Sequence, residues 1–223
     1  MVALFVSLMF IGLLLTDLIL QRVEARKAIR AAERLAAPGD LASWVTVPEG
    51  VRISPGHSWA MPLQEGTVRA GVDSLVANAV GKVHRVQLPS VGEWIEAGRP
   101  LARLAFNGSS LAVAAPVSGR ISSVNQNLHE HPETVANDPY GKGWICSIDQ
   151  AQPRNHALHS GRKAALWLEC ELDRFREFLS ARITPQFAME PTSQDAGLPV
   201  PGVMEQLNPE AWVAFEREFA QIR

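Results

Sequence analysis

The hydrophobic and polar positions of this 223-residue chain change pattern several times, and the longest apolar run comes first. Residues 2–20, VALFVSLMFIGLLLTDLIL, are apolar apart from Ser7, Thr16 and Asp17. A helix of this length rises roughly 28 Å, close to the hydrocarbon thickness of a bilayer. The pattern predicts one transmembrane helix through residues 2–20, in contact with the lipid bilayer.

Positive residues follow this run, and no charged side chain precedes it. They are Arg22, Arg26, Lys27, Arg30 and Arg34. The positive-inside rule then predicts a single-pass protein of the inner (cytoplasmic) membrane with a cytoplasmic C-terminal domain. A cleaved signal peptide is the alternative, but it would need a basic leading region and a shorter apolar run. Residues 1–37 are therefore expected to form an anchor and helical stalk, and residues 38–53 a linker.

Short alternating segments separated by glycine or proline fill residues 54–149. Such spacing is typical of a small β-sandwich or barrel, so the fold class expected is mainly β with C-terminal α-helices. One amphipathic stretch, residues 73–81, interrupts the strands, and it predicts a short helix capped by Asp73 or Ser74 and ended by Gly81. Asn107-Gly108 between two apolar runs predicts a β-hairpin.

The predicted hairpin tip holds only small neutral residues, namely Asn107, Gly108, Ser109 and Ser110. It offers no nucleophile beside a base, because the serines lack a Gly-x-Ser-x-Gly context. Acidic residues elsewhere in the domain are spread over different turns: Asp73, Glu93, Glu96 and Asp138. The sequence therefore predicts no catalytic residues and no enzyme activity.

Charge and the placement of cysteine and histidine argue against nucleic-acid binding and metal binding. The net charge of −2 gives no basic field for nucleic acid. Cys146 and Cys170 are far apart, and a cytoplasmic chain would keep them as buried thiols. His129 and His131 form a lone H-x-H, typical of a solvated loop, so no metal site is expected.

Helical periodicity returns after a polar connector. Residues 150–183 are expected to hold one amphipathic helix that starts at Ser160 and packs on the β-domain or on a partner. Residues 184–223 begin as a proline-rich strap and end in a helix capped by Asn208. That helix is too short to be stable alone, so its aromatic face should be buried on this domain or on another subunit. The face carries Trp212, Phe215 and Phe219.

Four stretches of the β-region occur together in one order: GHSW (56–59), TVRAGVDSLVANAVGKVHRVQLPSVGEWIEAG (67–98), APVSGRISSVN (115–125) and NDPYGKGWICSI (137–148). They resemble the H protein of the glycine cleavage system, a lipoyl carrier. The resemblance implies a barrel-sandwich hybrid of two small sheets, with Trp59 and Trp144 in the core. Trp94 follows a turn and is a candidate exposed contact.

The resemblance also places the lipoyl-bearing lysine at the hairpin tip, at the position of Gly108. The chain has four lysines, and none lies between Lys82 and Lys142. Lipoate needs an amine to form its amide, so no lipoyl cofactor is expected.

Two functions remain open at this point. The first is a non-catalytic, non-lipoylated accessory or scaffold subunit that binds other protein subunits of a membrane complex, for which an electron-transfer assembly is an analogy only. The second is a membrane-tethered carrier-like domain that binds a small ligand or a lipoyl-bearing partner. The candidate partner-binding residues are Asn107, Gly108, Ser109, Ser110, Trp94, Trp212, Phe215 and Phe219.

Overall fold

The structure is a computed structural model, and it describes residues 41–64, 66–106, 108–149, 158–182 and 198–221. Its strands are β1 (Arg52–Ile53), β2 (Ser58–Gln64), β3 (Thr67–Val72), β4 (Arg85–Gln87), β5 (Trp94–Ile95), β6 (Pro100–Ala105), β7 (Ser110–Ala114), β8 (Gly119–Val124), β9 (Cys146–Asp149) and β10 (His159–Ser160). Its helices are α2 (Leu41–Val45), α3 (Ser74–Val80), η1 (Gln126–His129), α4 (Thr134–Asn137), α5 (Gly161–Ser180), η3 (Val203–Gln206), α6 (Pro209–Phe215) and η4 (Glu216–Ala220).

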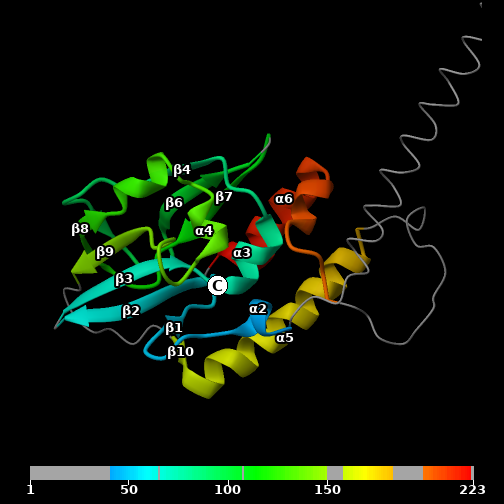
Figure 1. The fold of residues 1–223 in the computed structure, drawn as a ribbon, viewed down its shortest axis with the longest axis horizontal. Helices are drawn as coiled ribbons and strands as arrows, with labels where there is room; N and C mark the ends of the chain where they lie inside the picture. The colour runs from blue at the N-terminus through cyan, green and yellow to red at the C-terminus, as the bar shows by residue number, and fades with distance from the viewer. Residues whose placement is uncertain (1–40, 65, 107, 150–157, 183–197, 222–223) are drawn as a thin grey trace, which may run out of the picture. The chain divides into compact units, whose positions relative to one another are not determined.

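The described strands form two antiparallel sheets (Figure 1). One sheet has seven strands in the order β10-β1-β2-β3-β9-β8-β5, and the other has three in the order β4-β6-β7. Alternation along each strand turns one set of apolar side chains inward, so Ile121, Leu104 and Leu111 are almost completely buried. The mainly β fold with C-terminal helices is therefore confirmed.

Helix α3 begins and ends where the local sequence requires. The Asp73 side chain accepts a hydrogen bond from the Val76 backbone N–H at 3.0 Å and so caps the helix. Gly81 ends it at a φ of 72°, a conformation that a residue with a Cβ rarely adopts. A Cβ at Gly81 would also lie 2.6 Å from the Cα of Gly202, so glycine is needed for the close approach of η3. The predicted helix over residues 73–81 is thus present.

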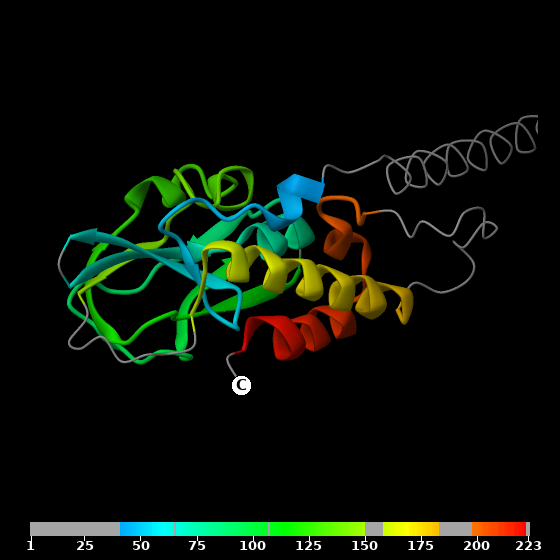
Figure 2. The same cartoon turned by 90° about the horizontal axis from the view of Figure 1, so that it is seen from below.

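The C-terminal helices pack on the β-domain of the same chain. Helix α5 lies against β1, β10 and α2, while η4 lies beside β7. Figure 2 shows α5 and the segment of α6 and η4 side by side. The buried stripe of α5 consists of Ala164, Leu168, Glu171, Leu172, Phe175, Phe178 and Leu179. The amphipathic pattern therefore predicted this face, except that it also contains a carboxylate.

Several expectations fall outside the described residues: the anchor and stalk of residues 1–37, Asn107 at the hairpin tip, and most of the proline-rich strap. Within the ranges that the structure describes, no helix combines the length and apolar character that a membrane crossing needs. The expectation of two buried thiols was wrong for one of them. Cys146 is buried in β9, whereas Cys170 is exposed because it lies on the outer side of α5.

Candidate functional site

The β6–β7 hairpin ends in a tight turn at the predicted position. Ala105 pairs with Ser110, and the Phe106 N–H donates to the Ser109 carbonyl at 2.9 Å. Gly108 has a φ of +77°, the left-handed conformation that hairpin turns demand. A Cβ at Gly108 would meet no heavy atom within 4 Å, so the position is exposed and open.

The inner side of the tip is covered by helix α6. The ring of Trp212 stacks on the ring of Phe106, with centroids 4.6 Å apart and planes at 27°. Trp212 is only 5% exposed and Phe106 only 7%. Asn208 holds the start of α6 by accepting from the Ala211 N–H at 2.9 Å, and Pro209 occupies the first turn. The hairpin tip and the C-terminal helix are therefore parts of one packed unit.

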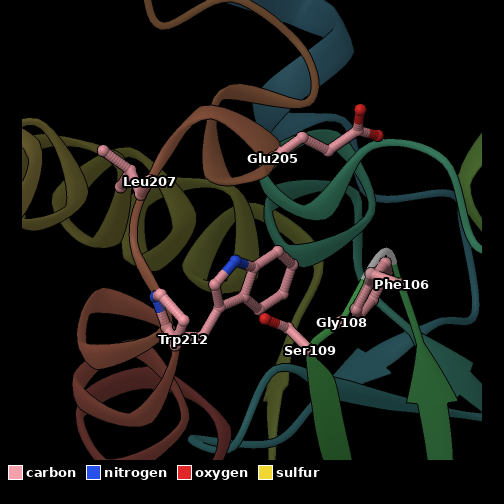
Figure 3. Close-up of a pocket in the computed structure, with 7 residues that line it drawn as sticks. Phe106, Gly108, Ser109, Glu205, Leu207 and Trp212 are labelled. Atoms are coloured by element: carbon pink, nitrogen blue, oxygen red, sulfur yellow. The ribbon is translucent and has the colours of Figure 1, made fainter.

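A small pocket of about 140 Å³ lies between the tip and the C-terminal segment (Figure 3). Its lining residues are Phe106, Gly108, Ser109, Glu205, Leu207, Pro209 and Trp212. In Figure 3 the indole of Trp212 and the ring of Phe106 face the pocket beside Ser109, whereas the carboxylate of Glu205 points away from Trp212. That carboxylate accepts a hydrogen bond from the Lys82 backbone N–H. The pocket is thus lined by two aromatic rings, two aliphatic side chains and the polar side chains of Ser109 and Glu205.

The two remaining aromatic residues of the tail lie in a cluster of phenylalanine rings. Phe215 and Phe219 stack on each other at 5.1 Å, and both meet Phe175 and Phe178 of α5 edge to face. Offset and edge-to-face pairs are the favoured geometries for aromatic rings. The aromatic face of the last helix is therefore buried on the chain's own hairpin and α5, one of the two surfaces expected.

The exposed candidate, Trp94, lies in a different place. It belongs to the two-residue edge strand β5, and 49% of its surface is exposed. Strand β5 pairs with β8 in the larger sheet, whereas the tip belongs to the smaller one. The structure therefore brings Ser109, Gly108 and Trp212 together but leaves Trp94 in the other sheet.

A buried polar cluster joins the β-domain to α5. The Nδ1 of His57 lies 2.7 Å from an Asp73 carboxylate oxygen, and its Nε2 lies 3.3 Å from Glu171. Arg174 donates to both oxygens of Glu171 at 2.8 and 2.6 Å. The Trp167 ring lies 4.9 Å from the imidazole. The turn before β2, the N-cap of α3 and helix α5 are thereby held together.

These contacts set the charge of the cluster. Burial on its own lowers the pKa of His57, but the two carboxylates outweigh it, Asp73 most, and raise the pKa to about 9. His57 and Arg174 outweigh the opposite effect of burial on Glu171 and lower the pKa of its carboxyl. Both ring nitrogens of a protonated His57 donate to carboxylates, and the side chain is fully buried. The cluster therefore acts as a clamp between the β-domain and α5 around a fully buried imidazole.

The sequence indicated little of this cluster. His57 lay inside the G-H-S-W stretch, and Asp73 was expected only as a cap; Glu171 lies 114 residues from His57. A carboxylate on the apolar stripe of α5 was the one available signal, because a buried Glu needs a partner.

The remaining residues singled out in the sequence, Asp138, Trp59 and Trp144, have structural roles. Asp138 accepts from the Gly141 and Lys142 N–H groups, as expected for a turn. Trp59 is fully buried and donates to the Pro139 carbonyl at 3.1 Å. The expected core position was wrong for Trp144, which is half-buried because its ring lies beneath the guanidinium of Arg69, 4.7 Å from the ring centre. Within the described residues, no three His, Cys, Asp or Glu side chains gather as metal ligands.

The two sheets, the exposed hairpin turn and the motif order define a small β-domain of the carrier class. The Glycine cleavage H-protein family profile matches residues 51–169, more than half of the chain, and the chain therefore belongs to this family. A glycine cleavage system H protein of Coprothermobacter proteolyticus is 38% identical over 103 residues, covering 46% of this chain and 81% of the relative.

Similar values describe further relatives. The Mycobacterium bovis glycine cleavage system H protein is 34% identical over 114 residues, covering 51% of this chain and 85% of the relative. The crystal structure of a glycine cleavage system H protein from Mycobacterium marinum shares 31% identity and a TM-score of 0.49, covering 54% of this chain and 98% of the other. The matched region ends within α5, so α6 and η4 lie beyond it.

Proposed function

We propose that this protein is a non-lipoylated, non-catalytic H-type domain that serves as an accessory subunit of a membrane-bound complex. Residues 2–20 would anchor it in the cytoplasmic membrane, with the described domain on the cytoplasmic side. Other protein subunits would be its partners, and an electron-transfer assembly is one context in which such a subunit could serve.

One observation carries this proposal: the hairpin tip packs against the chain's own helix α6 at the place where the family resemblance puts a lipoyl arm. Gly108 has no amine, and no lysine lies in the hairpin. On the inner side, Trp212 stacks on Phe106 and ties the tip to α6. A hairpin that delivers a swinging arm has no need of a helix packed against its tip. A subunit that presents a rigid surface benefits from such packing, because rigid surfaces lose less entropy on binding.

Two measurements on protein from its native membrane test the proposal. Intact mass spectrometry should give the mass of the chain without a lipoyl group. Affinity purification of the full chain in mild detergent should recover larger membrane subunits in fixed stoichiometry. A lipoyl group on any of the four lysines, or a chain that purifies alone, would refute the corresponding half of the proposal.

A second function is favoured by the pocket at the tip. Its volume of about 140 Å³ and its mixed lining, which includes the rings of Phe106 and Trp212, suit a small, partly apolar group in contact with Trp212. A lipoyl-bearing partner could supply such a group, because sulfur contacts aromatic rings favourably. In that case a truncated protein starting at residue 40 should be soluble and monomeric. It should also bind lipoamide, with a change in tryptophan fluorescence that Trp212→Phe reduces.

A further inference from the structure

We propose that the outer face of the β4–β6–β7 sheet is a docking surface for an acidic segment of a partner protein. This inference rests on the accessory-subunit function proposed above and adds the chemistry of the partner. The face, called the arginine face below, consists of Arg85, Gln87, Arg103, Ala105, Ser110 and Ala112.

Strand register places these residues on one side of the sheet. Arg85 pairs with Ala105, and Gln87 pairs with Arg103. Directly paired residues of antiparallel strands point to the same face, and diagonal neighbours lie about 7–8 Å apart. Arg85 and Arg103 form such a diagonal, and Arg85, Gln87 and Arg103 are all exposed. The intervening residues, such as Val86 and Leu104, point into the core.

The guanidinium groups of this face have unused hydrogen-bond donors. Arg103 donates to the Ser110 hydroxyl at 3.1 Å, which leaves most of its five N–H donors free. Among the described residues, neither Arg85 nor Arg103 has a carboxylate within ion-pair distance. The sequences of β4, β6 and β7 contain no Asp or Glu. Two nearby donor groups therefore face solvent with no negative charge on their own surface.

Neighbouring acidic residues are engaged elsewhere. Glu93 accepts from the Ser90 N–H at 3.1 Å, and Glu96 lies 3.9 Å from Arg99 in the turn before β6. The other residues of the face apart from Gln87 are short: Ala105, Ser110 and Ala112. An extended or helical segment with spaced carboxylates can therefore reach both guanidinium groups.

The number and type of charges favour a protein over the other anionic partners. Recognition of anionic lipid from sequence typically involves clusters of four to eight basic residues, whereas this face has two. Nucleic acid also needs many phosphate contacts. Two arginines about 7–8 Å apart instead match two carboxylates on one segment, since guanidinium binds a carboxylate with two parallel hydrogen bonds.

The test uses the full chain in a neutral detergent and an immobilised oligoglutamate peptide of about twelve residues as the probe. The double variant Arg85→Glu, Arg103→Glu reverses both positive charges of the arginine face. The matched control, Arg99→Glu with Arg162→Glu, makes the same change in net charge at two exposed positions off the face. Circular dichroism should be unchanged for both, because every altered side chain is exposed.

We expect wild-type protein to bind the peptide, and to bind an oligoglutamine peptide of equal length much more weakly. The face variant should lose roughly tenfold or more in affinity, as two exposed guanidinium–carboxylate pairs imply, and the control less than about threefold. Salt should weaken binding as the Debye length falls from about 10 Å at 0.1 M to 3 Å at 1 M.

Three results would overturn the docking surface: no binding of oligoglutamate, equal losses in the face variant and the control, or binding only to vesicles of phosphatidylcholine and phosphatidylserine. The native-membrane purification separates this failure from failure of the accessory role. If a native complex co-purifies but the peptide does not bind, only the docking surface is wrong. If no subunit co-purifies but the peptide binds through Arg85 and Arg103, only the accessory role is wrong.

Discussion

The buried His57 makes the stability of this domain depend on pH in a defined window. We expect the free energy of unfolding to fall as the pH rises from 6.5 to about 9, because the clamp between Asp73 and Glu171 then loses its proton. The pKa of His57 is raised in the folded protein to about 9 from an unfolded value of 6.5. A group with a raised folded pKa contributes stability that is complete below its unfolded pKa and lost as the pH passes its folded pKa.

The size of the effect follows from the same pKa values. At 1.36 kcal/mol for each pKa unit, the difference between 6.5 and about 9 corresponds to about 3 kcal/mol. Solvent screening does not reduce this value, because the His57 side chain is completely buried. For a domain of this size, about 3 kcal/mol is a large part of a typical stability of 5–15 kcal/mol.

The perturbation that isolates this group is His57→Asn. His57 has a φ of 57°, and asparagine is among the residues that tolerate that conformation best. The variant has no imidazole at this site, so its stability should lack the His57-dependent fall between pH 6.5 and 9. The matched control is His131→Asn, since His131 is exposed on a loop and, within the described ranges, its ring pairs with Glu133 alone.

Urea unfolding of the full chain in mild detergent, followed by tryptophan fluorescence, measures the effect. Trp167 contacts the imidazole and provides a local reporter. Wild-type protein and the His131→Asn control should each lose about 3 kcal/mol relative to His57→Asn as the pH rises from 6.5 to about 9. If the wild type and His57→Asn give parallel profiles, His57 is not a charged clamp, and the reasoning from its two carboxylate partners is wrong.

Further predictions concern the tip, the thiols and the turn glycine. Trp212→Ala should destabilise the protein by about 3–5 kcal/mol and expose the tail to protease. The control Val213→Ala, at a 70%-exposed position, should change stability by less than about 0.5 kcal/mol. Unchanged protection of the tail in Trp212→Ala would contradict the packing of α6. Ellman's reagent should titrate one thiol, Cys170, in the folded protein and two after denaturation, because Cys146 is buried and burial raises its pKa to about 12. Rapid reaction of both thiols in the folded protein would contradict the burial of Cys146. Gly108→Lys should fold with a loss of about 1–2 kcal/mol, from the left-handed backbone alone, since its Cβ meets no neighbour; a larger loss in urea unfolding would show that the tip is more crowded than the structure indicates.

The local sequence alone determined much of the β-domain. The Asn-Gly pair sets a hairpin turn because a glycine at positive φ is what such turns require, and Gly108 has a φ of +77°. Asp73 and Gly81 bound α3 because their capping roles depend only on neighbours a few residues away. The absence of a lysine between residues 82 and 142 is also a property of the sequence itself.

Only the tertiary structure decided which distant residues meet. The sequence predicted an aromatic face on the last helix, but what covers it depends on where the chain returns after the strap. Trp212 reaches Phe106 across 106 positions, and Glu171 reaches His57 across 114. The face formed by Arg85 and Arg103 likewise depends on strand register, because a shift of one residue would turn either side chain into the core. Short-range preferences fix turns and caps, whereas long-range packing chooses partners that no local pattern specifies.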